Sequence, residues 1–193
     1  MSAPEAVAMP GTAPGLQLES SASDIVELAA LPGRGRDVET IALGRGVQLP
    51  ALGSTRVASD HLALCVRPER WLILTPPAAA GAAAGAGAAV WQAACAGLGT
   101  ALDQSSAFSV LELTGGAARE VLVRSCRVDL DPHAFPIGAA CATIMVQVPV
   151  ILVALASGVL LLTPASTARH LREWLVATAR PFGLIASSEV SGS

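Results

Sequence analysis

Three side chains that could carry out acid–base chemistry lie close together in the sequence. Asp129, Asp131 and His133 fall within five residues, and a carboxylate beside an imidazole can act as a general acid and base. The same run, with Pro132 inside it, is also typical of an ordered turn whose Asp side chains accept backbone hydrogen bonds. We favour the turn, because no triad pattern or metal-ligand spacing accompanies the cluster.

A glycine pair, Gly115-Gly116, separates a strand-like run from a helical one. Backbone N–H groups at such a junction can hold an anion. No GxGxxG pattern and no P-loop lysine supports that use here, so a helix-packing turn is favoured. Ser105-Ser106 follows Asp103 but lacks the glycines of a nucleophile elbow.

The cysteines and histidines do not indicate a metal site. The four cysteines form no CxxC pair and have no ligand spacing with any of the three histidines. Each cysteine lies in apolar sequence, which is typical of buried free thiols. We therefore expect no catalytic, cofactor-binding or metal-binding residues on this chain. The cysteines are Cys65, Cys95, Cys126 and Cys141.

The composition is apolar and poor in charge. Hydrophobic residues make up 52% of the 193 residues and charged residues 14%, against about 25% charged in a typical soluble domain. The net charge of −3, with no basic run, argues against nucleic-acid binding. Either a partner covers part of the surface, or abundant alanine raises the hydrophobic fraction.

One apolar stretch resembles a membrane span. Residues 139–164 carry no charge and are long enough to cross a bilayer as a helix. Pro149, the Ser157-Gly158 turn signal and the abundant valine favour buried strands instead. The N-terminus lacks a basic segment before Arg34 and a continuous apolar region. We expect a cytoplasmic protein without membrane contact.

The remaining pattern predicts alternating strands and helices. A strand is expected at 25–31. The segment 34–43 could hold one helical turn, and a second strand is expected at 55–58. A hairpin of 61–66 and 71–75 follows, then an Ala/Gly run at 78–87 that is a frayed helix start or a loop. One helix should bury Val90, Trp91, Ala94, Cys95 and Leu98. Beyond it we expect a strand at 108–113, a short helix from Ala117, strands at 142–148, 150–156 and 159–163, and a helix around Leu171, Trp174 and Leu175.

The order of these elements repeats. The runs 25–28, 47–50 and 72–76 correspond to 110–113, 128–132 and 160–164, at separations of about 81 to 88 residues. Each half ends in a helix with a tryptophan, Trp91 and then Trp174. The prediction is an α+β protein of two related β/α lobes that share one core. Its parts would be a disordered tail (1–22), a first lobe (23–102), a second lobe (103–185) and a flexible tail (186–193).

Several short motifs resemble those of one known family. The segment Cys126-x-x-Asp129-Leu130-x-Pro132-x-x-Phe135-x-x-Gly138 resembles C-x-x-D-L-x-P-x-x-F-x-x-G and is the most specific of them. Asp103-x-Ser105, followed by Leu-Glu-Leu-Thr-Gly115 and Ala-Arg119-x-x-Leu, resembles a D-x-S…L-x-L-S-G…A-R-x-x-L segment. Pro-x-x-Trp71-Leu-Ile and the helix around Trp174 also match. Together they resemble the gamma subunit of heterotetrameric sarcosine oxidase, which is similar in fold to the folate-binding T-protein of glycine cleavage.

The resemblance implies a small non-catalytic subunit packed mainly against the alpha subunit, with beta and delta subunits as further partners. The complex would demethylate sarcosine to glycine, producing hydrogen peroxide and methylene-tetrahydrofolate on other chains. FAD, FMN, NAD, tetrahydrofolate and zinc would all be held by the complex and none by this chain. The matched residues would serve the frame or the docking of the subunit: Trp71, Asp103, Ser105, Gly115, Arg119, Cys126, Asp129, Leu130, Pro132, Phe135, Gly138 and Trp174.

Two alternatives stay open at this point. A stand-alone folate-binding enzyme of the aminomethyltransferase type would need acidic residues in a central cavity, for which Asp103, Asp129 and Asp131 are the candidates. The chain could also be the equivalent subunit of an N-methylglutamate dehydrogenase, since the substrate would lie on a different chain.

Overall fold

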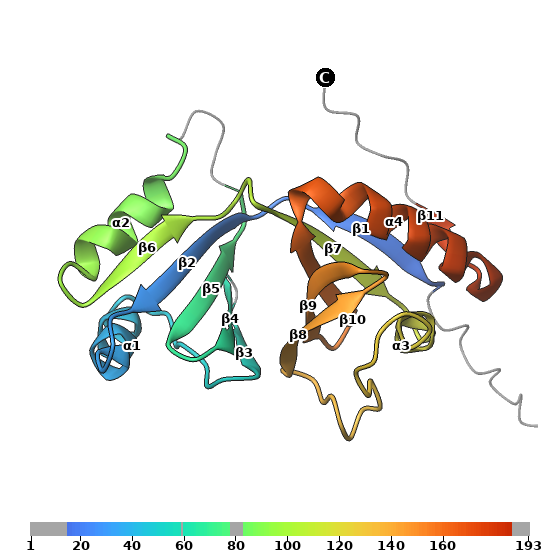
Figure 1. Ribbon diagram of the computed structural model, residues 1–193, viewed down its shortest axis with the longest axis horizontal. Coiled ribbons are helices and arrows are strands. Elements are labelled where there is room, and N and C mark those ends of the chain that lie inside the picture. The colour runs from blue at the N-terminus through green and yellow to red at the C-terminus, as the bar shows by residue number, and fades with distance from the viewer. Residues whose placement is uncertain (1–14, 59, 78–82, 187–193) are drawn as a thin grey trace, which may run out of the picture.

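The computed structural model describes residues 15–58, 60–77 and 83–186. Two sheets pack face to face, with helices on their outer faces, so the molecule has four layers (Figure 1). The first sheet has the strand order β3-β4-β5-β2-β6 and the second β11-β1-β7-β10-β9-β8. All neighbouring strands are antiparallel except β1 and β11.

The elements alternate along the chain much as the apolar pattern predicts. In the first half they are β1 (Gln17–Ser21), β2 (Asp24–Ala30), α1 (Gly35–Gly44), β3 (Ser54–Val57), β4 (Leu62–Arg67), β5 (Arg70–Thr75), α2 (Ala86–Ala94) and β6 (Gly99–Asp103). In the second half they are β7 (Phe108–Thr114), α3 (Ala118–Leu122), β8 (Ala140–Met145), β9 (Val148–Ala154), β10 (Gly158–Pro164), α4 (Ala165–Ala179), a 3-10 turn (Arg180–Phe182) and β11 (Ile185–Ala186).

The predicted repeat is visible in the sheet order. β2, β5, β4 and β3 lie side by side in the first sheet, and β7, β10, β9 and β8 lie in the same order in the second. The matched runs 25–28 and 110–113 fall in β2 and β7, and 72–75 and 160–163 fall in β5 and β10. The α+β fold of two related lobes is therefore confirmed.

The two lobes exchange a strand, which the sequence did not predict. β1 precedes β2 in the chain but pairs with β7 of the second sheet, from Gln17 opposite Thr114 to Ser21 opposite Val110. β6 precedes β7 but pairs with β2 of the first sheet. In Figure 1 the chain therefore crosses between the lobes twice.

This exchange corrects the predicted boundaries. The predicted tail 1–22 contains β1, whose Leu16 and Leu18 side chains are buried in the second lobe. The first sheet ends at Asp103 rather than 102, and Ala186 of the predicted C-terminal tail pairs with Leu18 in β11. Residues 1–14, the run 78–82 and residues 187–193 lie outside the described residues.

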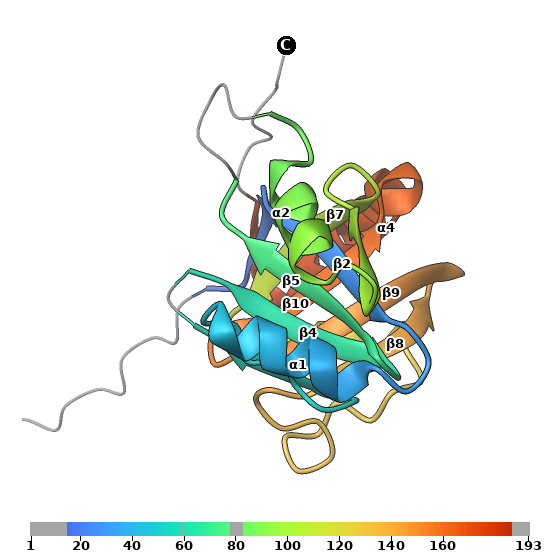
Figure 2. The ribbon, with the colours of Figure 1, turned by 90° about the vertical axis from the view of Figure 1, so that its left-hand side faces the viewer.

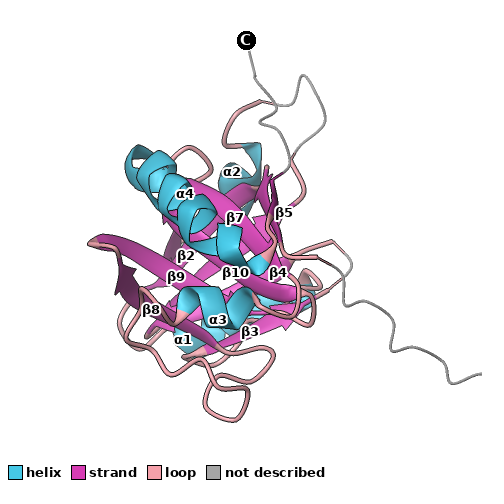
Figure 3. Cartoon of the chain, turned by 90° about the vertical axis from the view of Figure 1, so that its right-hand side faces the viewer, coloured by secondary structure: helices cyan, strands magenta, loops and turns pink. Residues whose placement is uncertain are grey.

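Three apolar clusters hold the layers together. One lies between the first sheet and helices α1 and α2, which cover its outer face (Figure 2). A second lies under α3 and α4 on the outer face of the second sheet (Figure 3). The third lies between the sheets and includes Ile25, Leu64, Val110 and Val153. The predicted shared core is this third cluster.

The long uncharged stretch forms strands. Residues 140–164 make β8, β9 and β10, and no helix among the described residues is long and apolar enough to span a membrane. β9 and β10 contribute side chains to both the second and the third cluster, so both of their faces are buried. A two-residue turn joins β8 to β9, and both of its residues have positive φ, +51° at Val146 and +65° at Gln147. Asn-Gly is the sequence that hairpins prefer for such a turn.

Two helices differ in detail from the expectation. α1 runs for ten residues rather than one turn, because Val38 and Ala42 bury one face against the first sheet. In α2 the buried position is Ala88, whereas the predicted core residue Val90 is 49% exposed. Cys95 is buried as expected, and Trp91 packs half-buried beneath Arg45, whose guanidinium lies 5.2 Å from the ring centroid.

Candidate functional site

The most specific family motif forms a loop clamped by Arg119. The Arg119 guanidinium, projecting from α3, donates to the carbonyl oxygens of Leu130 and Phe135. It also lies 5.9 Å from the Phe135 ring centroid. Leu130, Phe135 and Cys126 are buried in the core of the second lobe. The motif residues therefore hold the chain between α3 and β8 in one shape.

The Asp129–His133 cluster is the ordered turn favoured above. Asp129 Oδ1 accepts a hydrogen bond from the Asp131 N–H, and Asp131 Oδ1 accepts one from the His133 N–H. Hydrogen bonds from the His133 N–H and between its Nδ1 and the same Asp131 Oδ1 lower the pKa of Asp131. The Asp129 and Asp131 side chains accept hydrogen bonds within the turn, and the His133 side chain is exposed to solvent. The three side chains therefore do not surround a cavity.

Asp103 and Ser105 form a second turn, at the crossing from β6 to β7. Asp103 Oδ1 accepts from the Ser105 hydroxyl (2.6 Å) and the Ser105 N–H (2.9 Å), and these bonds lower the pKa of Asp103. Ser105 Oγ in turn accepts from the Ile25 N–H of β2. The D-x-S motif thus ties the crossing chain back to the first lobe.

Gly138 joins the two lobes. Its carbonyl oxygen accepts hydrogen bonds from the Thr55 N–H (2.8 Å) and hydroxyl (3.1 Å), while the Ala140 N–H donates to Gly53. We call residues 53–55 and 138–140 the seam, since here the edge of the first sheet meets the edge of the second. Gly138 has φ of +88°, a conformation that favours glycine.

The remaining motif residues are structural. Trp71 is buried and donates from its indole N–H to the Pro50 carbonyl oxygen. Gly115 takes a φ of +109° in the turn before α3, a helix of only five residues. Trp174 packs half-buried on the second-lobe core, and the ring of Pro132 is exposed. The structure does not bring the twelve predicted residues together at one site.

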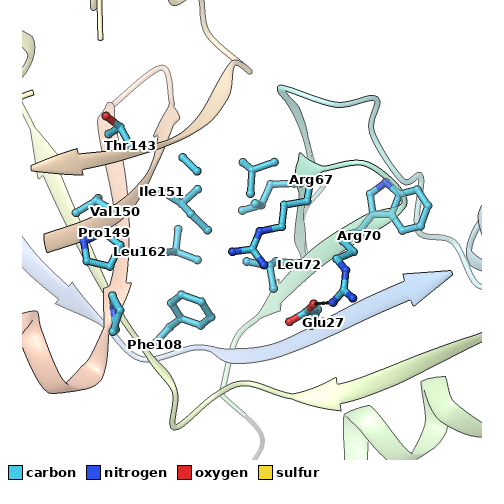
Figure 4. Close-up of a pocket in the computed structure, with 15 residues that line it drawn as sticks. Glu27, Arg67, Arg70, Leu72, Phe108, Thr143, Pro149, Val150, Ile151 and Leu162 are labelled. Atoms are coloured by element: carbon cyan, nitrogen blue, oxygen red, sulfur yellow. Dashed lines mark hydrogen bonds and ion pairs between the residues drawn. The ribbon is translucent and has the colours of Figure 1, made fainter. Parts of the chain in front are cut away.

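A cavity that sequence reasoning missed lies between the sheets. It encloses about 270 Å³ where the two sheets diverge beside the β4–β5 turn (Figure 4). Its walls are mostly apolar, with Leu72 and Trp71 from one sheet and Phe108, Ile151 and Leu162 from the other. Arg67 and Arg70 both extend into it, as Figure 4 shows.

The polar groups of the cavity leave it with a positive charge. Arg70 is paired with Glu27 at 2.8 Å, and Glu27 also accepts from the Gln104 amide. Arg67 has no ion pair within the described residues, so the two guanidinium groups and one carboxylate sum to +1. The cavity suits an apolar group with a carboxylate, and it holds no nucleophile paired with a base. The only sequence signal was the charged turn 67–70, where the second lobe has the uncharged turn 155–157 between β9 and β10.

The thiols and titratable clusters add no further chemistry. Cys65, Cys95 and Cys126 are buried, Cys141 is half-buried, and none is in a disulfide. Burial raises the pKa of Cys65, Cys95 and Cys141, which disfavours the reactive thiolate. Across the described ranges, no three His, Cys, Asp or Glu side chains lie close enough to hold a metal ion.

Comparison with known protein sequences gives consistent matches. A model of the sarcosine oxidase gamma subunit family matches residues 36–179. Sarcosine oxidase subunit gamma of an Arthrobacter species is 34% identical over 152 residues, covering 77% of this chain and 71% of the relative. The same subunit of Corynebacterium sp. strain P-1 is 34% identical over 178 residues, covering 89% and 84%.

Comparison with solved structures agrees. A chain of the heterotetrameric sarcosine oxidase from Corynebacterium sp. U-96, in complex with pyrrole 2-carboxylate, superposes with a TM-score of 0.76 and 29% identity, covering 91% of this chain and 88% of that one. The glycine cleavage aminomethyltransferase T of Bartonella henselae superposes with a TM-score of 0.66 at 16% identity, covering 89% of this chain and 47% of that one. The second likeness shows the fold alone.

Proposed function

The chain belongs to the sarcosine oxidase gamma subunit family, and from this premise we propose that it is the non-catalytic gamma subunit of a heterotetrameric sarcosine oxidase. The family match over residues 36–179 is the observation that carries the proposal. The partners would be the alpha, beta and delta subunits, with alpha as the main one, and the complex would act in the cytoplasm.

The arrangement of the side chains supports a structural role. The motif residues that identify the family are used in turns, in the core and in the seam: Arg119 clamps a loop, Ser105 holds a crossing and Gly138 joins the lobes. The described residues offer no ligand set for zinc. We propose that zinc, FAD, FMN, NAD and the tetrahydrofolate reaction belong to the other subunits, as the family resemblance implies.

The alternative of a stand-alone folate enzyme finds little support in the site. Its candidate acids, Asp103, Asp129 and Asp131, belong to two exposed turns and do not line the cavity between the sheets. A subunit of an N-methylglutamate dehydrogenase would use the same frame, and the family match favours sarcosine oxidase.

Spectroscopy and titration of the purified chain test the proposal. We expect a colourless protein, without flavin absorbance, that tends to aggregate in the absence of its partners. It should also show no saturable binding when tetrahydrofolate is added. A stable yellow monomer, or micromolar tetrahydrofolate binding, would contradict the non-catalytic role.

A further inference from the structure

The outer edge of β8 has unpaired backbone groups. β8 is the last strand of the second sheet and pairs only with β9. In the two-residue hairpin, Met145 faces Val148 as a hydrogen-bonded pair, so residues 141, 143 and 145 direct their N–H and C=O groups toward β9. Ala142 and Ile144 therefore direct theirs outward. The backbone N–H of Ala140 also points outward, and it donates to the carbonyl oxygen of Gly53 in the seam.

This edge lacks the features that keep sheet edges apart. Beyond Ala140 the seam ends, and no hydrogen bond reaches the outward groups of Ala142 or Ile144 from any described residue. Soluble proteins protect such edges with charged residues, proline or bulges. β8 (ACATIM) has no charge and no proline, and its pairing with β9 is regular.

Exposed aliphatic side chains lie on this edge and next to the seam. Four of the nine exposed large hydrophobic residues in the described ranges are Leu52, Val57, Ile137 and Ile144. Leu52 and Ile137 each precede a segment of the seam, and Val57 is the last residue of β3. Ile144 lies on β8 itself and is 65% exposed. An exposed aliphatic side chain on an open strand edge is typical of a position that a partner strand covers.

We propose that the β8 edge is where the subunit docks in its complex, by accepting an extended segment of another subunit as an additional strand along Cys141–Met145. This rests on the proposed function. The unpaired N–H and C=O groups call for a backbone in strand conformation, and the uncharged strand with its exposed Ile144 side chain calls for an apolar, uncharged segment. The new strand would pair with Ala142 and Ile144 and cover the Ile144 side chain.

Hydrogen exchange on the assembled complex tests the pairing directly. The amides of Cys141, Thr143 and Met145 are protected by β9 in any case. With an added strand, those of Ala142 and Ile144 should also be slowed, by about a hundredfold or more relative to a free edge. If the complex assembles and these two amides still exchange as in an open edge, the docking proposal fails and the subunit assignment stands.

A matched pair of variants tests the contribution of the side chain. Ile144→Asp and Leu43→Asp each place a charge at a position that is 65% exposed, on β8 and on α1 respectively. Ile144→Asp should reduce recovery of the subunit with its partners about tenfold or more, and Leu43→Asp should leave it unchanged. Equal recovery of both variants overturns the proposal. Protection of the edge by a second copy of this chain overturns the docking proposal alone, whereas failure of the wild-type chain to join any partner overturns it together with the subunit assignment.

Discussion

At the scale of single residues, the family motifs are explained by hydrogen bonds that close the backbone into specific shapes. Arg119 donates hydrogen bonds to the carbonyl oxygens of Leu130 and Phe135 in one loop of the second lobe. In the corresponding segment of the first lobe, the carbonyl oxygen of Pro50 accepts a hydrogen bond from Trp71. The two lobes thus anchor equivalent segments by different side chains. The Asp, Ser and His residues that first suggested chemistry form hydrogen-bonded turns instead.

The Arg119 clamp leads to a stability prediction. Arg119→Lys should lower the free energy of unfolding by about 1–3 kcal/mol, because a single ammonium group cannot match the planar fork that reaches both carbonyl oxygens. Arg127→Lys, at an exposed position of the same loop, should change it by less than about 0.5 kcal/mol. Urea unfolding of both variants gives the comparison, and equal stabilities would show that the clamp contributes nothing.

The lowered pKa of Asp103 predicts a pH dependence. Because the folded-state pKa lies below the unfolded value of about 3.9, the ionised carboxylate contributes stability above that value and loses it as pH falls through the folded pKa. Asp103→Asn keeps an acceptor oxygen but removes the charge. The wild type should therefore be the more stable at neutral pH, with the difference shrinking in acid. A difference that is constant from pH 7 to pH 2 would contradict the assignment.

At the scale of elements, local pattern predicted the hairpins and helices but not the exchanged strands. β4, β5, β9 and β10 were found because apolar runs and turn residues mark them. β1 and β6 are short and weakly patterned, and their strand conformation depends on pairing with a distant segment, β7 for β1 and β2 for β6. Pairings across 69–77 residues for β6 and 89–97 for β1 leave no signal in the segments themselves. The cavity was missed for the same reason, since its walls come from both sheets.

Close packing between strands gives a prediction at this scale. A Cβ added to Gly158, the first residue of β10, would collide with the Leu113 carbonyl oxygen and the Thr114 backbone of β7. Gly158→Ala should therefore destabilise the fold by about 2–3 kcal/mol. Gly44→Ala at the end of α1 meets open space and should stabilise it by about 0.5 kcal/mol. Thermal unfolding distinguishes the two, and similar shifts would contradict the packing of β10 on β7.

At the scale of the whole molecule, the low charge has two structural sources. The central strands β9 and β10 are buried on both faces, which explains most of the uncharged stretch that resembled a membrane span. The remainder is exposed on β8 and around the seam, where the composition favours coverage by a partner. A surface covered by a partner therefore stays a prediction that the sequence could not place, because an apolar core and an apolar interface have the same composition.

The most direct test of the central claim is the composition of the complex that this chain forms. When the tagged chain is co-expressed with alpha, beta and delta subunits and purified, it should elute with these three polypeptides in equal amounts, together with flavin absorbance and sarcosine oxidation. After dissociation, the flavin should remain with the other chains. If this chain elutes alone and carries flavin or oxidises sarcosine without partners, the account of a non-catalytic gamma subunit is wrong.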